Sequence, residues 1–191
     1  GGQPQSEVVL RTAADNVLRL AIVTSDIVYD PLDQMIYVSR PSSAGPNGNS
    51  ISRINPLTGD VVGSVYVGSE PNRLALSDNG QPLYSTLDGA YEIRRYDTTS
   101  QTPGIQFSMG RGQSVNANDA HYLASEIAVV PGNPDLLAVA RYKPGISPPG
   151  AGVAIFNNGV QLPNTGPGHN DSSIFLAFAG ASTLYGGGYG N

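Results

Sequence analysis

The sequence has no cysteine and no tryptophan, and only 13% of its 191 residues are charged. Without cysteine the chain can form no disulfide bond, no thiolate metal site and no covalent haem attachment, and it has no thiol nucleophile. Without tryptophan it lacks the large aromatic platform on which a quinone cofactor would stack. These absences exclude several classes of redox and thiol-dependent enzyme.

Basic residues are also scarce, because 10 Lys and Arg stand against 15 Asp and Glu, for a formal net charge of −5. Proteins that bind nucleic acid or an anionic membrane surface need a basic footprint. We therefore expect no nucleic-acid partner. No apolar run approaches the roughly 18 residues of a membrane-spanning helix, so we also expect no membrane insertion. The chain begins with Gly1-Gly2, which we interpret as loss of a leader or excision from a longer chain.

What the sequence has in quantity is turn residues, with 24 Gly and 15 Pro. They separate short apolar runs, and the clearest example spans residues 25–68. Its four runs are residues 27–29, 35–39, 50–54 and 61–67. Short apolar runs separated by Asp, Asn, Pro and Gly are typical of strands and turns. This stretch therefore predicts one four-stranded antiparallel unit.

The same unit recurs along the chain. Its first apolar run, residues 27–29, corresponds to residues 74–76, 127–129 and 174–176, at intervals of 47, 53 and 47 residues. A period of 40–50 residues with four strands per unit indicates blades of a β-propeller. We predict an all-β fold of about four blades, namely residues 24–68, 70–110, 123–166 and, in part, 172–191. A lead-in of residues 1–23 would contribute outer strands.

The residues of the first unit also carry a family resemblance. Its Ile-Tyr-Val-Ser (36–39), Asn-Pro-Leu-Thr-Gly (55–59) and Val-Tyr-Val-Gly (65–68) resemble the bacterial YVTN β-propeller repeat. That repeat occurs in surface and secreted proteins and is related in fold to quinoprotein and lactonase propellers. The match is weaker in residues 71–110 and loose in residues 124–166. The resemblance implies a bacterial protein that is secreted, periplasmic or attached to the cell surface.

The number of units leaves two arrangements open. Propellers of this type resemble seven-bladed rings, so the chain would be about half of a ring, and further blades would be its partners. Alternatively, residues 7–23 could supply the outer strands of a last blade whose inner strands are residues 173–187, which would close a small ring. We favour the first arrangement, because the chain ends in a Gly-rich run typical of an incomplete blade.

Strand parity predicts which face of the blades carries function. The enlarged connections are residues 40–49 and 142–152, which follow second strands, and residues 110–124, which precede a first strand. In a four-stranded antiparallel blade all three positions lie on one face. Enlarged loops on one face of a repeat protein usually form its binding surface.

The candidate binding residues belong to this face because they lie beside first-strand starts or second-strand ends. They are Asp26, Arg40, Asn72, Arg73, His121, Glu126, Arg141 and His169. Three tyrosines, Tyr37, Tyr84 and Tyr185, instead recur at one repeat position. Such recurrence favours packing between blades, with a hydroxyl group that needs a hydrogen-bond partner.

The function that these features favour is a non-enzymatic binding or scaffold module, with no catalytic residue and no cofactor. Its ligand would be an unidentified protein, carbohydrate or small molecule. The alternative is a metal-dependent enzyme similar to propeller lactonases or lyases. In that alternative Asp26, Asn72 and Glu126 would hold a divalent cation such as Ca²⁺, and His121 or His169 would act as general base.

Overall fold

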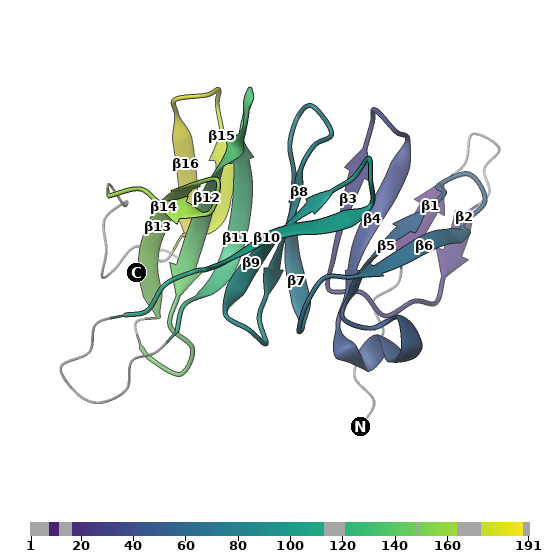
Figure 1. Ribbon diagram of the computed structural model, residues 1–191, viewed down its shortest axis with the longest axis horizontal. Helices are drawn as coiled ribbons and strands as arrows, with labels where there is room; N and C mark the ends of the chain where they lie inside the picture. The colour runs from purple at the N-terminus through teal and green to yellow at the C-terminus, as the bar shows by residue number, and fades with distance from the viewer. Residues whose placement is uncertain (1–7, 12–16, 113–120, 148, 164–172, 189–191) are drawn as a thin grey trace.

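The fold is all-β, as the sequence predicts. The computed structural model describes residues 8–11, 17–112, 121–147, 149–163 and 173–188. Within these residues the strands form three four-stranded antiparallel sheets and two two-stranded hairpins. The five units stand side by side in an arc (Figure 1). We call the three complete sheets blades 1, 2 and 3.

In each blade every strand is hydrogen-bonded to the one that follows it in sequence, so each blade is a simple meander. Blade 1 consists of β3 (Asp26–Asp30), β4 (Met35–Arg40), β5 (Ser50–Ile54) and β6 (Val61–Tyr66). Blade 2 consists of β7 (Pro71–Leu76), β8 (Leu83–Leu87), β9 (Glu92–Asp97) and β10 (Thr102–Ser108). Blade 3 consists of β11 (Leu123–Val130), β12 (Asn133–Tyr142), β13 (Gly150–Asn157) and β14 (Val160–Gln161).

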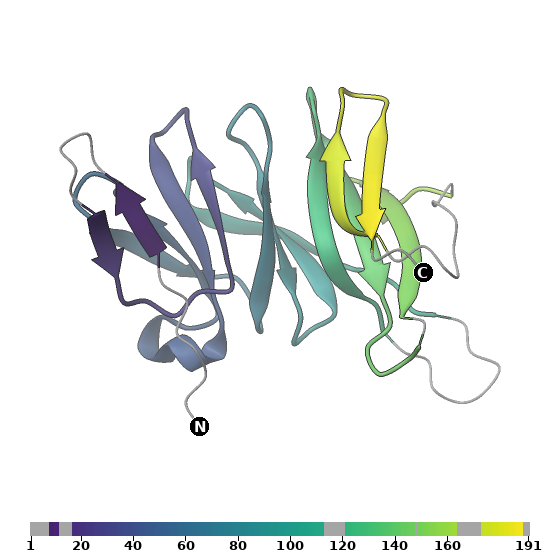
Figure 2. The same cartoon turned by 180° about the vertical axis from the view of Figure 1, so that it is seen from behind.

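The two hairpins lie at opposite ends of the arc (Figures 1 and 2). The first pairs β1 (Val8–Arg11) with β2 (Val17–Leu20), and the last pairs β15 (Ser173–Phe178) with β16 (Leu184–Gly188). Because they form separate sheets, the first hairpin does not complete the last one. The small closed ring is therefore not the arrangement of this structure.

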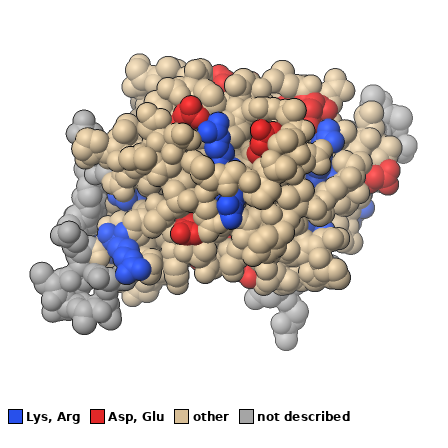
Figure 3. Space-filling model, viewed as in Figure 1, with Lys and Arg blue, Asp and Glu red and all other residues tan. Residues whose placement is uncertain are grey.

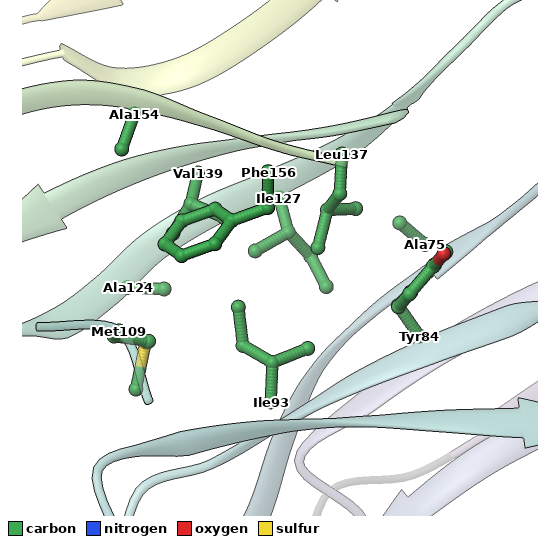
Figure 4. Packing of buried hydrophobic residues seen from close by; sticks show 10 residues of the cluster. All are labelled: Ala75, Tyr84, Ile93, Met109, Ala124, Ile127, Leu137, Val139, Ala154 and Phe156. Carbon is green, nitrogen blue, oxygen red and sulfur yellow. The ribbon is translucent and has the colours of Figure 1, made fainter. Parts of the chain in front are cut away.

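Hydrophobic side chains fill the spaces between neighbouring blades. Figure 4 shows the cluster between blades 2 and 3, in which Ile93 and Tyr84 face Ile127, Leu137 and Phe156. A similar cluster lies between blades 1 and 2. Burying each large apolar side chain contributes about 1.5–3 kcal/mol. Stability therefore comes mainly from contacts between sheets, which no blade can make alone.

The recurring tyrosines pack between blades as predicted, where the blade has a neighbour. Tyr37 and Tyr84 are fully buried. The Tyr37 hydroxyl donates to Asp33 Oδ2 at 2.8 Å, and the Tyr84 hydroxyl donates to the Pro134 carbonyl of blade 3 at 3.0 Å. Burial and the bond to Asp33 raise the pKa of Tyr37. Both hydroxyl groups thus have the partners that burial requires.

The enlarged connections lie on one face, which we call the loop-rich face; it is the lower edge of the arc in Figure 1. It carries the 3₁₀ helix η1 (Ser42–Asn47) between β4 and β5, residues 143–147 after β12, and the described ends of the connection from β10 to β11, residues 109–112 and 121–122. The short turns lie on the opposite, tight-turn face. No helix among the described residues is long and apolar enough to cross a membrane.

One connection is shorter than the sequence predicts. The sequence predicts a turn-like connection at residues 97–104, between the third and fourth strands of the second unit, but β10 already begins at Thr102. Proline is tolerated on an edge strand because its missing N–H would face solvent. The register of β10 shifts between Pro103 and Gln106, which accommodates the ring.

Candidate functional site

Asp26 begins β3 on the loop-rich face and uses both carboxylate oxygens for backbone contacts. Its Oδ1 accepts a hydrogen bond from the Ile27 N–H and its Oδ2 from the Leu74 N–H of blade 2, both at 2.8 Å. Its own N–H donates to Ser39 Oγ at 3.0 Å. Asp26 therefore links blade 1 to blade 2 through a hydrogen bond.

Asn72, near the start of β7, forms hydrogen bonds with a neighbouring aspartate and a neighbouring serine. Its Nδ2 donates to Asp88 Oδ2 at 2.7 Å, and its carbonyl accepts from Ser39 Oγ at 2.6 Å. Thr86 Oγ1 donates to the other Asp88 oxygen at 3.2 Å. Burial raises the pKa of Asp88, while the two hydrogen bonds and the charge of Arg73 oppose that rise. This carboxylate is held in place on both sides.

Glu126 is the fourth residue of β11 and lies at the repeat position of Asp26, but its hydrogen bond is local. Its Oε1 accepts from the Ile127 N–H at 3.0 Å. Burial raises the pKa of Glu126, the Ile127 bond and the positive charge of Arg73 lower it, and the negative charge of Asp26 raises it. Three predicted residues, Asp26, Arg73 and Glu126, are thus brought within electrostatic reach of one another from three blades. The buried Nε of Arg73 has no hydrogen-bond partner.

A hollow of about 340 Å³ lies beside this group, lined by Ser25, Glu70, Pro71, Asn72 and Asp88. Glu70 connects the hollow to the η1 connection. Its N–H donates to Asn49 Oδ1 at 2.9 Å, and its Oε2 accepts from the Ser42 N–H at 3.3 Å. The lining is acidic, with two carboxylates and no basic side chain.

Arg40 and Arg141 occupy equivalent second-strand ends, and both are buried, with 8% and 7% of their surface exposed. Arg40 Nη2 donates to the Ala44 carbonyl in η1 at 3.5 Å. Arg141 Nη1 donates to the Met109 carbonyl and to Gln161 Oε1, both at 3.2 Å. Burial lowers the pKa of both guanidinium groups. Arg40 therefore links the end of β4 to η1. Arg141 links β12 to Met109, just after β10, and to Gln161 of β14.

A basic-aromatic cluster surrounds Arg141 at the base of the connection from β10 to β11. The Arg141 guanidinium lies 4.5 Å from the centre of the Tyr122 ring. His121 stacks on Tyr91 with ring centres 4.6 Å apart, and it forms a β-bridge with Arg111. We define the cluster as Arg111, His121, Tyr122, Arg141 and Lys143.

Sequence reasoning identified only His121 and Arg141 of this cluster. Lys143 lies across Gly112, so closely that a Cβ atom on that glycine would be 2.8 Å from Lys143 Cε. Arg111 and Tyr122 flank one enlarged connection and Lys143 begins another. Their positions at the ends of enlarged connections could have identified Arg111, Tyr122 and Lys143 from the sequence.

The structure gives no observation in favour of a metal centre. Among the described residues, no group of three or more His, Asp or Glu side chains is arranged to hold a metal ion. Of the predicted ligands, Asp26 has both oxygens occupied by N–H groups, and Asn72 is bonded to Asp88. His169 lies outside the described residues. The metal-dependent alternative stays a prediction.

Comparisons with known proteins bear on the fold. No family model and no curated protein sequence matches the chain. Among solved structures, U3-55K matches at 18% identity over 88% of this chain, with a TM-score of 0.57. The RRP9 WD40 repeats match at 19% over 87%, also with a TM-score of 0.57. Hydrazine synthase of Kuenenia stuttgartiensis matches at 16% over 75%, with a TM-score of 0.56.

The chain has a propeller-type fold. The aligned region spans 45%, 44% and 37% of those three chains, so the likeness covers an arc of blades in longer proteins. At such low identity it extends to the fold alone, and the YVTN family stays a prediction.

Proposed function

We propose that this chain is a non-enzymatic binding module whose loop-rich face binds an acidic segment of a partner protein. The observation that carries the proposal is the basic-aromatic cluster. The chain has a net charge of −5 and only 10 Lys and Arg, yet Arg141 and Lys143 lie beside one tyrosine, Tyr122, and Arg111 belongs to the adjacent β-bridge with His121.

The cluster has charge available for a partner. Among the described residues neither Arg111 nor Lys143 takes part in an ion pair, whereas Arg53 and Arg95 elsewhere each pair with an aspartate. Arg111 is exposed, and Lys143 is partly exposed. Figure 3 shows that charged residues are otherwise scattered over the viewed surface. A local positive potential on an acidic protein steers an anionic partner to one place.

Part of the cluster is also held in place before binding. Arg141 is fixed by its two hydrogen bonds and in turn supports the Tyr122 ring, while the β-bridge between Arg111 and His121 closes the base of the connection. Aromatic and guanidinium groups in fixed positions lose little conformational entropy on binding. Carboxylates suit this surface because guanidinium groups can bind them through two parallel hydrogen bonds.

The setting of the module follows from the resemblance of residues 36–39 and 55–59 to the YVTN repeat. On that basis we place it in a bacterial protein that is secreted, periplasmic or attached to the cell surface. Further blades would cover the outward faces of the end units.

The test is fluorescence anisotropy with a labelled ten-residue polyglutamate peptide at low salt. We expect saturable binding that weakens as salt screens the charges. The double variant Arg111→Glu/Lys143→Glu should bind at least tenfold more weakly, equal to about 1.4 kcal/mol. The control is Arg19→Glu, which makes half of this charge change on an exposed residue of β2 and should bind like the unmodified chain.

Three results would reject the proposal. The first is no binding at low salt, and the second is an equal loss in the Arg19 variant, which would reflect net charge alone. The third is tighter binding of a single-stranded oligonucleotide than of the peptide.

A further inference from the structure

A hollow lies on the tight-turn face, where sequence reasoning placed no site. It has a volume of about 460 Å³, within the usual range for small-molecule sites. It lies between blades 1 and 2 at the turns after β3, β7 and β9, at the upper edge of Figure 1. Its lining residues are Asp30, Leu32, Asp33, Arg53, Asn79, Gly80, Gln81, Thr98, Thr99 and Gln101.

The lining is polar, because every residue except Leu32 and Gly80 carries a side chain that forms hydrogen bonds. Arg53 Nη2 pairs with Asp33 Oδ2 at 3.2 Å, so these two charges offset each other. That leaves a mixture of amide, hydroxyl and carboxylate groups around an open space. Such a lining disfavours an apolar ligand, and two carboxylates disfavour an anion.

Asp30 is the most constrained of these groups. Only 2% of its surface is exposed, and its Oδ1 accepts from the Leu32 N–H at 2.9 Å. Its Oδ2 faces Gly80, where a Cβ atom would lie 3.2 Å away. A glycine with φ of 76° therefore leaves room beside a buried carboxylate oxygen that any other residue would narrow.

One buried donor in the lining has no partner among the described residues. The Nε of Arg53 is buried and has no hydrogen bond. Asn79 is exposed, and its Oδ1 accepts from Ser77 Oγ and from the Gln81 N–H, both at 2.9 Å, so its amide N–H groups remain available to solvent or to a ligand. Thr98 is fixed by its bond to the Gly80 carbonyl at 2.6 Å. Buried polar groups without partners call for a bound molecule.

We propose that this hollow binds a neutral saccharide. Each sugar hydroxyl both donates and accepts, so a pair of hydroxyls can donate to Asp30 and accept from Arg53 or Asn79. A ligand without net charge suits a lining whose guanidinium is already paired. This site lies on the face opposite the basic-aromatic cluster and is independent of the acidic partner proposed above.

The experiment is isothermal titration calorimetry with four neutral trisaccharides: maltotriose, cellotriose, mannotriose and chitotriose. We expect saturable, millimolar binding of at least one, because water competes for each hydrogen bond. Asp30→Asn and Arg53→Lys should each weaken it at least fivefold. Each keeps the shape of the side chain but changes the charge of the carboxylate or removes the guanidinium N–H groups.

Arg95→Lys is the matched control. Arg95 pairs across strands with Tyr84 as Arg53 does with Tyr37, but it lies outside the hollow. It should leave binding unchanged. If Asp30→Asn lowers the melting temperature, Thr99→Ala and Gln101→Ala, two changes at the rim, should still weaken binding at least twofold. No saturable heat with any trisaccharide, or equal loss in Arg95→Lys, would overturn the proposal.

Discussion

The same repeat positions are buried in the middle of the arc and exposed at its ends. On the face toward the preceding unit, Ile27 of blade 1 is 49% exposed, whereas its equivalents Leu74 and Ile127 are 7% and 3% exposed. On the face toward the next unit, Tyr84 is 1% exposed and Tyr185 of the last hairpin is 63% exposed. Residue type therefore does not decide burial here; the presence of a neighbouring sheet does.

The difference shows where the folding energy of this chain resides. The first hairpin covers blade 1 only in part, through Leu18 and Leu20, and leaves Ile27 and Tyr29 uncovered. In a repeat protein, stability is approximately the sum of unit and interface terms. The interfaces between blades 1, 2 and 3 should thus be the most stable part of the molecule.

The largest expected effect contrasts two equivalent tyrosines. Tyr84→Ala removes a buried ring and its bond to Pro134, and should lower the free energy of unfolding by about 3–5 kcal/mol. Tyr185→Ala should change it by about 0.5 kcal/mol or less, because that side chain is exposed. Urea denaturation of both variants measures this. Similar losses in the two would show that the last hairpin is covered in solution.

A smaller effect concerns the hydrogen bonds between blades. Asp26→Ala leaves the Leu74 N–H without its acceptor and should cost about 1–3 kcal/mol. Glu126→Ala, at the same repeat position, should cost less, because Glu126 bonds only the adjacent N–H of its own strand. Both are measured by urea denaturation, and an equal cost would mean that the link between blades 1 and 2 contributes nothing beyond local capping.

Much of the fold could be predicted from the sequence because each repeat unit has a recognisable local pattern of apolar runs and turn residues. Apolar triplets at a fixed spacing indicated the blades, and strand parity placed the enlarged connections on one face. Ser39 shows the limit of that reasoning. Its Oγ accepts from Asp26 of blade 1 and donates to the Asn72 carbonyl of blade 2. Only the packing of two blades reveals that contact.

The candidate site was predicted less well. Asp26 and Arg141 were chosen as polar residues near loops, yet both support the backbone. Conversely, Asn79 and Thr98 read as ordinary turn residues, because turn-forming and ligand-facing side chains are of the same types. Their convergence with Asp30 depends on how blades 1 and 2 stack, which a repeat period does not specify.

The exposed ends offer a further test that leaves stability nearly unchanged. Phe175 is 65% exposed on the last hairpin, and a polar replacement removes apolar surface without leaving a cavity. Phe175→Ser should therefore reduce binding of a hydrophobic fluorescent dye, with a melting temperature within about 1 °C of the unmodified chain. Unchanged dye fluorescence would place the accessible apolar surface elsewhere.

The smallest expected effect comes from a half-buried charge in the middle of the arc. Burial raises the pKa of Glu126 above its unfolded value, against the opposing bond from Ile127 and the charge of Arg73. The stability that this group contributes is present below its unfolded pKa and is lost as pH rises through its folded pKa. Glu126→Gln resembles the protonated form at every pH, and its amide oxygen can still accept from Ile127.

The variant should therefore melt roughly 1–2 °C higher than the unmodified chain at pH 7, and the difference should shrink toward zero near pH 4. Asp97→Asn is the control of opposite sign, because hydrogen bonds from Ser100 lower the pKa of Asp97. Its replacement should lower the melting temperature at pH 7, with a smaller loss in acid. If Glu126→Gln instead melts lower at pH 7, then the attraction of ionised Glu126 to Arg73 outweighs the cost of burial. That outcome would mean that the attraction between Arg73 of blade 2 and Glu126 of blade 3 stabilises the contact between these two blades.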